Sequence, residues 1–238
     1  MVRAEPVNSY DKYRAKQSQV RVQSAYDVAF KLHTLGFCVI PSGGGKSGKA
    51  PLVSWAEYQH RPSTESELNH WETTLHPKLW GMVTGAISGV VVIDADTPET
   101  RAELETEIGM PPHVLTPRGG GHYYFKHPGY LVKTTVRIVP QVDIRADGGF
   151  VNTVGSRPDG EYTILRLPTP DILIPWEQLP ARIRQALDSS KSATVPITTE
   201  GTIPEGDRKA HLTSLAGSMR HRGMPQAALE ILRWKGYS

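Results

Sequence analysis

The sequence contains a single cysteine, Cys38, in 238 residues. One thiol can form neither an internal disulfide framework nor the multi-cysteine ligand set of a zinc or iron–sulfur site, so these classes of protein are excluded. The sequence also lacks any run of about 18 apolar residues, which excludes a membrane-spanning helix. Residues 1–16 are polar and lack the apolar stretch of a secretory signal, so we expect a cytoplasmic protein with no membrane partner.

A large excess of one charge sign is also absent. Lysine and arginine number 27 and aspartate and glutamate 24, which gives a formal net charge of +3. This balance permits contact with a polyanion but does not by itself argue for one. Apolar residues make up 38% of the chain and charged residues 21%, which is enough for a packed core in one large domain with a small appendage.

Helix and strand patterns alternate along most of the chain. Apolar residues at helical spacing predict helices at about residues 20–35, 64–75, 100–108 and 176–187. Apolar runs between turn signals predict strands at residues 37–40 (ended by Pro41), 80–84, 90–93, 114–116, 122–126, 142–144, 150–154 and 162–165. The mixture predicts an α/β (α+β) fold.

Composition divides the chain into three parts. Residues 1–188 form the main body, residues 189–204 are rich in Ser, Thr and Pro and are predicted to be a linker, and residues 205–238 contain two short helical patterns. Two short helices bury little surface alone. The last part is therefore either the incomplete beginning of a larger helical unit or a terminal hairpin that docks on the main body.

The most informative stretch is a β-branched run, Val90–Ile93, followed by Asp94 and Asp96. Acids at positions i and i+2 of an extended chain point to the same side. A divalent cation would relieve their repulsion, and hard oxygen ligands suit Mg²⁺ or Mn²⁺. Two solvated turn acids are the more common origin of this spacing alone. The buried strand before the acids favours a ligand site at the end of that strand.

Two later stretches place polar residues on predicted strands. Gly119–Gly121 precede His122, where the glycines allow close backbone approach to a ligand and the histidine could contact a phosphate; the alternative is a glycine turn into an aromatic strand. Asp143 lies between apolar residues, and a buried carboxylate needs a partner. Metal ligation or a salt bridge to Arg145 or another arginine supplies one. Asp147, before two glycines, is predicted to be a turn acid.

The lysine- and glycine-rich residues 43–50 nearly match a nucleotide-binding P-loop. In the register that fits the glycines, Ala50 stands where a Ser or Thr would bind magnesium. The sequence from Pro51 onward does not open a helix, so the helix N-terminus that cradles phosphates is missing. We therefore reject a P-loop, although its lysines can contact phosphate as point charges.

Together these segments resemble the bifunctional primase–polymerase family of the archaeo-eukaryotic primase superfamily. The family pattern is an acid-x-acid after a hydrophobic strand, a glycine-preceded histidine that opens a strand, and a third acid on a later strand. Asp94 and Asp96, His122 and Asp143 occur in that order, and the resemblance covers about residues 25–187. Six more positions match an upstream Lys-x-Pro…Trp segment and a later Gly-Gly turn and serine: Lys49, Pro51, Trp55, Gly148, Gly149 and Ser156.

The resemblance implies a primase-like catalytic core, with an RRM-like sheet plus a smaller α/β portion, followed by a short C-terminal helical appendage. It implies a template-directed nucleotidyltransferase in which Asp94, Asp96 and Asp143 are catalytic and hold two Mg²⁺ or Mn²⁺ ions. The phosphates of the incoming nucleotide would be bound by His122, Lys49, Arg118, Arg145 and Ser156.

The resemblance also implies partners. Residues 205–238 resemble the helical primase C-terminal segment of this family, except that Lys209 stands where Asn is common and the segment ends early. Single-stranded DNA template and primer, together with NTP or dNTP, would be the substrates in replication of a phage, plasmid or integrated element in the host cytoplasm. A helicase domain or subunit is a further expected partner.

Three other classes of function fit the acids. A sugar-nucleotide glycosyltransferase uses the same D-x-D with Mn²⁺ but gives no account of the glycine–histidine strand. A metal-dependent phosphohydrolase would use the same acids to release monophosphate. A non-catalytic origin-binding or single-strand-binding module would bind DNA equally well without a divalent metal.

Overall fold

The computed structural model describes residues 24–192. The predicted helical segment 205–238, and all of the predicted linker beyond Ser192, lie outside the described residues. The described part is a mixed α/β fold in which four α-helices pack on one antiparallel sheet. None of these helices is both long and apolar enough to cross a membrane, as judged over the residues described.

The sheet has ten strands in the order β2-β1-β3-β9-β10-β5-β6-β4-β8-β7, and neighbouring strands are antiparallel. Each run predicted as a strand overlaps a strand of the sheet, whereas β2 and β7 were not predicted. The bounds are β1 Val39–Gly44, β2 Ala50–Pro51, β3 Leu79–Val83, β4 Val90–Ala95, β5 Val114–Leu115, β6 Gly121–Lys126, β7 Thr135–Val139, β8 Val142–Arg145, β9 Phe150–Arg157 and β10 Gly160–Ile164.

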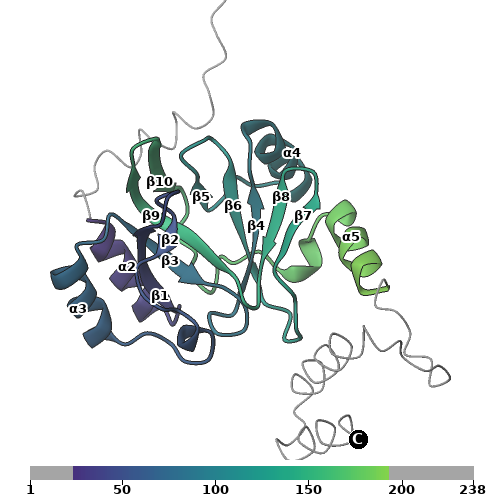
Figure 1. The fold of residues 1–238 in the computed structure, drawn as a ribbon. Coiled ribbons are helices and arrows are strands. Elements are labelled where there is room, and N and C mark those ends of the chain that lie inside the picture. Colours follow the sequence, from purple (N-terminus) through teal and green to yellow (C-terminus); the bar gives the residue numbers. More distant parts are fainter. Residues whose placement is uncertain (1–23, 193–238) are drawn as a thin grey trace, which may run out of the picture. The chain divides into compact units, whose positions relative to one another are not determined.

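The helices begin where side chains cap their free N–H groups. Ser24 and Asp27, and likewise Thr64 and Glu67, form reciprocal capping boxes, and Thr97 caps the helix that Pro98 opens. Figure 1 shows two of the helices at the β1 end of the sheet and the last beside β7. The bounds are α2 Ala25–Thr34, α3 Glu65–Leu75, α4 Pro98–Ile108 and α5 Ala181–Ser192, with 3₁₀ turns η1 Glu57–Gln59 and η2 Trp176–Gln178.

Strand β4 is buried on both faces, as its unbroken β-branched run predicts. Val90 and Val92 belong to the apolar cluster that α2 and α3 cover, whereas Val91 and Ile93 belong to the cluster under α4 and α5. Side chains alternate between the faces of a strand. Asp94 therefore continues the Val90 and Val92 face, at the point where that apolar cluster ends.

At two places a proline led to a wrong predicted boundary. Strand β1 does not end at Pro41. That residue pairs with Trp80, and its carbonyl accepts the N–H of Leu52, so its place in the sheet does not require an N–H group. The predicted helix 176–187 is broken, because Pro180 follows η2 and precedes a new helix. That helix, α5, continues to Ser192, past the predicted start of the linker at 189.

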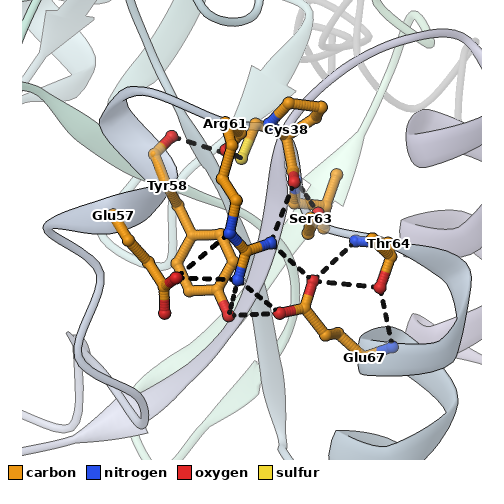
Figure 2. A network of polar contacts seen from close by, with 9 residues as sticks. Cys38, Glu57, Tyr58, Arg61, Ser63, Thr64 and Glu67 are labelled. Atoms are coloured by element: carbon orange, nitrogen blue, oxygen red, sulfur yellow. Dashed lines mark hydrogen bonds and ion pairs between the residues drawn. The ribbon is translucent and has the colours of Figure 1, made fainter.

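A polar network joins η1, the loop after it and the start of α3 (Figure 2). Arg61 donates to both carboxylate oxygens of Glu67, to Glu57 and to the hydroxyl of Tyr58. Glu67 also accepts the backbone N–H of Thr64 and so completes the capping box of α3. We call Glu57, Tyr58, Arg61, Thr64 and Glu67 the Arg61 cluster. It fastens the helical layer to the chain that follows β1.

Candidate functional site

Three polar side chains lie in one row across the sheet. Asp94 on β4 pairs with His122 on β6 and, on the other side, with Asp143 on β8. Paired residues on neighbouring strands present their side chains on the same face. The Nε2 atom of His122 lies 3.3 Å from Oδ1 of Asp94. Strand register thus brings Asp94 together with two residues from distant parts of the sequence, and we call these three residues the Asp94 row.

A cavity of about 460 Å³ opens beside this row. Five of the predicted site residues line it, and the other polar lining residues, which were not predicted, are Thr97, Thr116, Gln141, Arg157 and Tyr162. The lining is polar and carries both signs of charge, as a site for a charged ligand requires. Its polar members are Lys49, Asp94, Asp96, Thr97, Thr116, Arg118, His122, Gln141, Arg157 and Tyr162.

Backbone contacts hold the acid-x-acid segment in place. The N–H of Asp96 donates to the carbonyl of Gln141, which adopts a left-handed conformation with φ of 58° in the turn between β7 and β8. A Cβ on Gly120 would stand 2.1 Å from the carbonyl oxygen of Ala95. Close backbone approach is therefore the reason for this glycine, as predicted, but its neighbour is the chain that carries the acids and not a ligand.

The two acids beside the cavity have opposite pKa shifts. Burial raises the pKa of Asp94, but the charge and hydrogen bond of His122, with Arg145 and Lys49, lower it by more, so the net shift is downward. Burial also raises the pKa of Asp96, and the charges of Asp94 and Asp143 raise it further. The repulsion among Asp94, Asp96 and Asp143 thus has its net effect at Asp96, whose charged form is disfavoured.

Asp143 has its oxygens occupied by protein donors. Its Oδ1 accepts the backbone N–H of Arg137 at 2.7 Å, and its Oδ2 is bonded by the guanidinium of Arg145. The same guanidinium lies 4.0 Å from Oδ2 of Asp94. The salt bridge that the sequence left open as the partner of Asp143 is therefore present, and Arg145 stands between two of the three predicted metal ligands.

His122 is 3% exposed, and its Nδ1 atom has no hydrogen-bond partner among the described residues. A buried ring nitrogen without a partner costs free energy, and a hydrogen bond to a bound ligand would offset this cost. The ring faces Tyr162, with 5.9 Å between ring centroids, and both residues line the cavity. An anion in the cavity would accept a hydrogen bond from this nitrogen when the ring carries protons on both nitrogens.

The other predicted residues fall outside the cavity lining. Ser156 is exposed on β9, and its predicted nucleotide contact stays a prediction. Asp147 is a turn acid, as expected, and ties loops together by accepting from the N–H groups of Ala86 and Val132 and from His127. The signal for the missed Arg157 was a charged residue at the strand end before the Pro-Asp-Gly turn, on a strand longer than predicted.

The carboxylates of Asp94 and Asp96 at the cavity have donor chemistry that fits a divalent cation. Carboxylate oxygens are the preferred ligands of Mg²⁺ and Mn²⁺, and the raised pKa of Asp96 reflects repulsion that a cation would relieve. Within residues 24–192, no three His, Cys, Asp or Glu side chains stand as a complete metal-binding group. Asp94 and Asp96 are available at the cavity, whereas Asp143 reaches an ion only if Arg145 moves.

The residue pattern has a counterpart among known families. The model of the family described as bifunctional DNA primase/polymerase, N-terminal, matches residues 29–182. This range includes every strand of the sheet and all residues of the Asp94 row. No curated protein matches the chain.

Proposed function

The chain belongs to the bifunctional DNA primase/polymerase family, and we propose that its cavity carries out template-directed addition of nucleotides to a 3′-hydroxyl. The observation that carries this proposal is the shared register of Asp143, Asp94 and His122 beside a polar cavity. It joins carboxylates suited to a metal with a buried nitrogen suited to a phosphate on one face of the sheet. The support for DNA and nucleotides as the substrates comes from membership of this family.

We propose that Mg²⁺ or Mn²⁺ is held by Asp94 and Asp96, and that Asp143 joins them as a ligand of a second ion when Arg145 moves aside. Bound cations would lower the pKa of the attacking hydroxyl and neutralise the charge of the leaving pyrophosphate. Asp94 and Asp96 fix where this positive charge stands, because β4 is buried on both faces and the N–H of Asp96 is held by Gln141.

The remaining cavity residues would bind the nucleotide. In its imidazolium form, His122 would donate from Nδ1 to a phosphate oxygen while its Nε2–H faces Asp94. Lys49 and Arg118 would add positive charge from other parts of the cavity wall. Single-stranded template and primer would bind through contacts between their phosphates and lysine and arginine side chains, so binding would weaken with salt. Replication of a phage, plasmid or integrated element, together with a helicase, is the proposed context.

Primer extension on a single-stranded DNA template with Mn²⁺ or Mg²⁺ tests the proposal. Asp94→Asn keeps the size of the side chain and removes its charge, so incorporation should fall by about a hundredfold or more. Asp171→Asn makes the same chemical change at an exposed acid outside the cavity and should leave incorporation intact. Circular dichroism of both variants should match the parent protein. Full incorporation by the Asp94 variant would remove the metal assignment.

The same assay separates the other classes of function. Consumption of sugar nucleotides without template would favour a glycosyltransferase, and release of monophosphate without chain extension would favour a phosphohydrolase. DNA binding that is equal with and without divalent metal, and that is unchanged by Asp94→Asn, would favour a non-catalytic module. Template-dependent extension by the parent protein is expected in each case to exclude these alternatives.

A further inference from the structure

One carboxylate joins two arginines at the edge of the cavity. Asp159 lies in the turn between β9 and β10, and its Oδ1 is 3.1 Å from Nε of Arg157. Its Oδ2 is 3.6 Å from Nε of Arg118, which comes from the loop before β6. Both arginines line the cavity, whereas Asp159 does not. A single acid therefore faces two guanidinium groups that also face the ligand space.

Arg157 is the more enclosed of the two arginines. Its side chain is 10% exposed, compared with 74% for Arg118. The Nε atom of Arg157 makes no hydrogen bond within the described residues, because the nearby Asp159 oxygen lies within ion-pair distance but outside hydrogen-bond geometry. The guanidinium also contacts the hydroxyl of Tyr162, which packs against His122. A buried donor beside a cavity is thus left poorly satisfied by its acidic partner.

The β9–β10 turn is held against the loop that carries Arg118. A Cβ on Gly160 would lie 3.2 Å from both Cβ and the carbonyl oxygen of Pro117, and Gly160 has φ of 133°. The absence of a side chain at this position lets the two segments approach. The backbone of the turn therefore places Asp159 beside the two arginines.

We propose that Asp159 is a built-in competitor of the substrate's phosphates: its carboxylate occupies Arg118 and Arg157 until a polyphosphate replaces it. Arginine binds carboxylate and phosphate through the same donors, and a polyphosphate carries several negative charges where Asp159 carries one. The exchange lowers affinity for anions of single charge and reserves the pair of arginines for polyphosphates. The identity of that polyphosphate as a nucleotide rests on the function proposed above.

Calorimetric titration with inorganic tripolyphosphate, in the absence of divalent metal, tests this competition directly. Asp159→Asn should bind tripolyphosphate about threefold to tenfold more tightly than the parent protein, because the competing charge is gone. Glu161→Gln is the matched control, since it removes one negative charge from an exposed residue of the same hairpin. Its affinity should stay within about twofold of the parent value.

The sign of the change decides the role of Asp159. Weaker binding of tripolyphosphate by Asp159→Asn than by the parent protein would mean that the acid positions the arginines and does not compete. An affinity of Asp159→Asn equal to that of the parent protein would mean that the acid does neither. Each result overturns the proposal. Asp159→Ser should repeat the tighter binding and guards against a folding artefact of one variant. Arg157→Gln should weaken binding, and in that background Asp159→Asn should tighten binding by a smaller factor, because only Arg118 is then released.

The same proteins separate this inference from the proposed function. If primer extension fails in the parent protein while Asp159→Asn still tightens tripolyphosphate binding, the competition stands and the polymerase proposal falls. If extension succeeds while Asp159→Asn leaves the affinity for tripolyphosphate unchanged, the polymerase proposal stands and the competition falls.

Discussion

Two charged clusters of this fold contain similar residue types but differ in whether their polar atoms have partners within the protein. In the Arg61 cluster, the guanidinium of Arg61 meets Glu57 and Glu67, and each contact drawn in Figure 2 ends on another protein atom. In the Asp94 row, Asp94 lies against Nε2 of His122, yet the buried Nδ1 of the same ring has no hydrogen-bond partner among the described residues. This second cluster borders the cavity, and no residue of the Arg61 cluster lines that cavity.

The difference teaches how to tell a structural cluster from a functional one. Hydrogen bonds from Arg61 hold the pKa of Glu67 at about 2, so its charge is stabilised by the fold. Burial and the charges of Asp94 and Asp143 raise the pKa of Asp96, so its charge is opposed by the fold. Charged groups that destabilise the folded protein are typical of sites where a bound ligand offsets that destabilisation. The following predictions test that distinction.

Among the tests of this comparison, the largest effect is expected at His122, whose Nδ1 has no partner among the described residues. His122→Gln should raise the KM for the incoming nucleotide about tenfold, because a charge-assisted hydrogen bond to phosphate is lost, while kcat falls by less. Initial rates of primer extension over a range of nucleotide concentrations measure both constants. An unchanged KM would remove His122 from the phosphate site.

A second buried histidine supplies the control. Nδ1 of His113 accepts the N–H of Tyr124 and its Nε2 faces the carbonyl of Ile172, so both ring nitrogens are used within the protein. Burial lowers the pKa of His113 to about 4, and the ring is neutral at pH 7. His113→Gln should lower the unfolding temperature and leave the KM unchanged. A raised KM in this variant would show that KM responds to any loss of packing near β6.

A smaller effect is expected in the Arg61 cluster, and it should appear in stability alone. Glu67→Ala removes the capping box of α3 and the main partner of Arg61, and should lower the free energy of unfolding by about 1–2 kcal/mol. Denaturant titration measures this loss. Glu65→Ala, an exposed acid in the same first turn, should cost only a few tenths of a kcal/mol. Primer extension should be unaffected in both variants.

Glu67 also gives the cluster a defined pH dependence. Its pKa is about 2 in the folded protein, below its ordinary value of 4.5, because of the hydrogen bonds from Arg61. A lowered pKa means that the stabilisation is complete above about pH 4.5 and is lost as the pH falls toward 2. The parent protein should lose this part of its stability across that window, and Glu67→Ala should not. Equal slopes would show that the ion pair contributes nothing.

The sequence predicted the elements better than it predicted their register. The run Val90–Ile93 and the capping residues Thr64 and Glu67 carry their structure in local pattern, so β4 and α3 were foreseen. The boundaries at Pro41 and Pro180 were misjudged. The first depends on which backbone groups face a neighbouring strand, and at the second the helical pattern was continued across a proline.

The site shows the same division. Asp94, Asp96, His122 and Asp143 were proposed as members of one neighbourhood, because family pattern and the cost of buried charge both point to them. That Asp94 pairs with both His122 and Asp143 is a matter of strand pairing, which no local pattern encodes. Arg157 was missed for this reason, since it reaches the cavity through the pairing of β9 with β10.

The smallest effect should separate the two clusters most sharply, because its sign is opposite. The raised pKa of Asp96 means that its charged form lowers the stability of the folded protein at pH values above that pKa. Asp96→Asn removes this charge, so the unfolding temperature at pH 7 should rise. The rise should be about one degree, because solvent screens the repulsion at this exposed residue. Adding Mn²⁺ should raise the unfolding temperature of the parent protein more than that of the variant, since a cation relieves the same repulsion. Differential scanning fluorimetry with and without Mn²⁺ measures both shifts. A lower unfolding temperature, as expected for Glu67→Ala, would place Asp96 among the structural acids and leave the Asp94 row without its metal-facing neighbour.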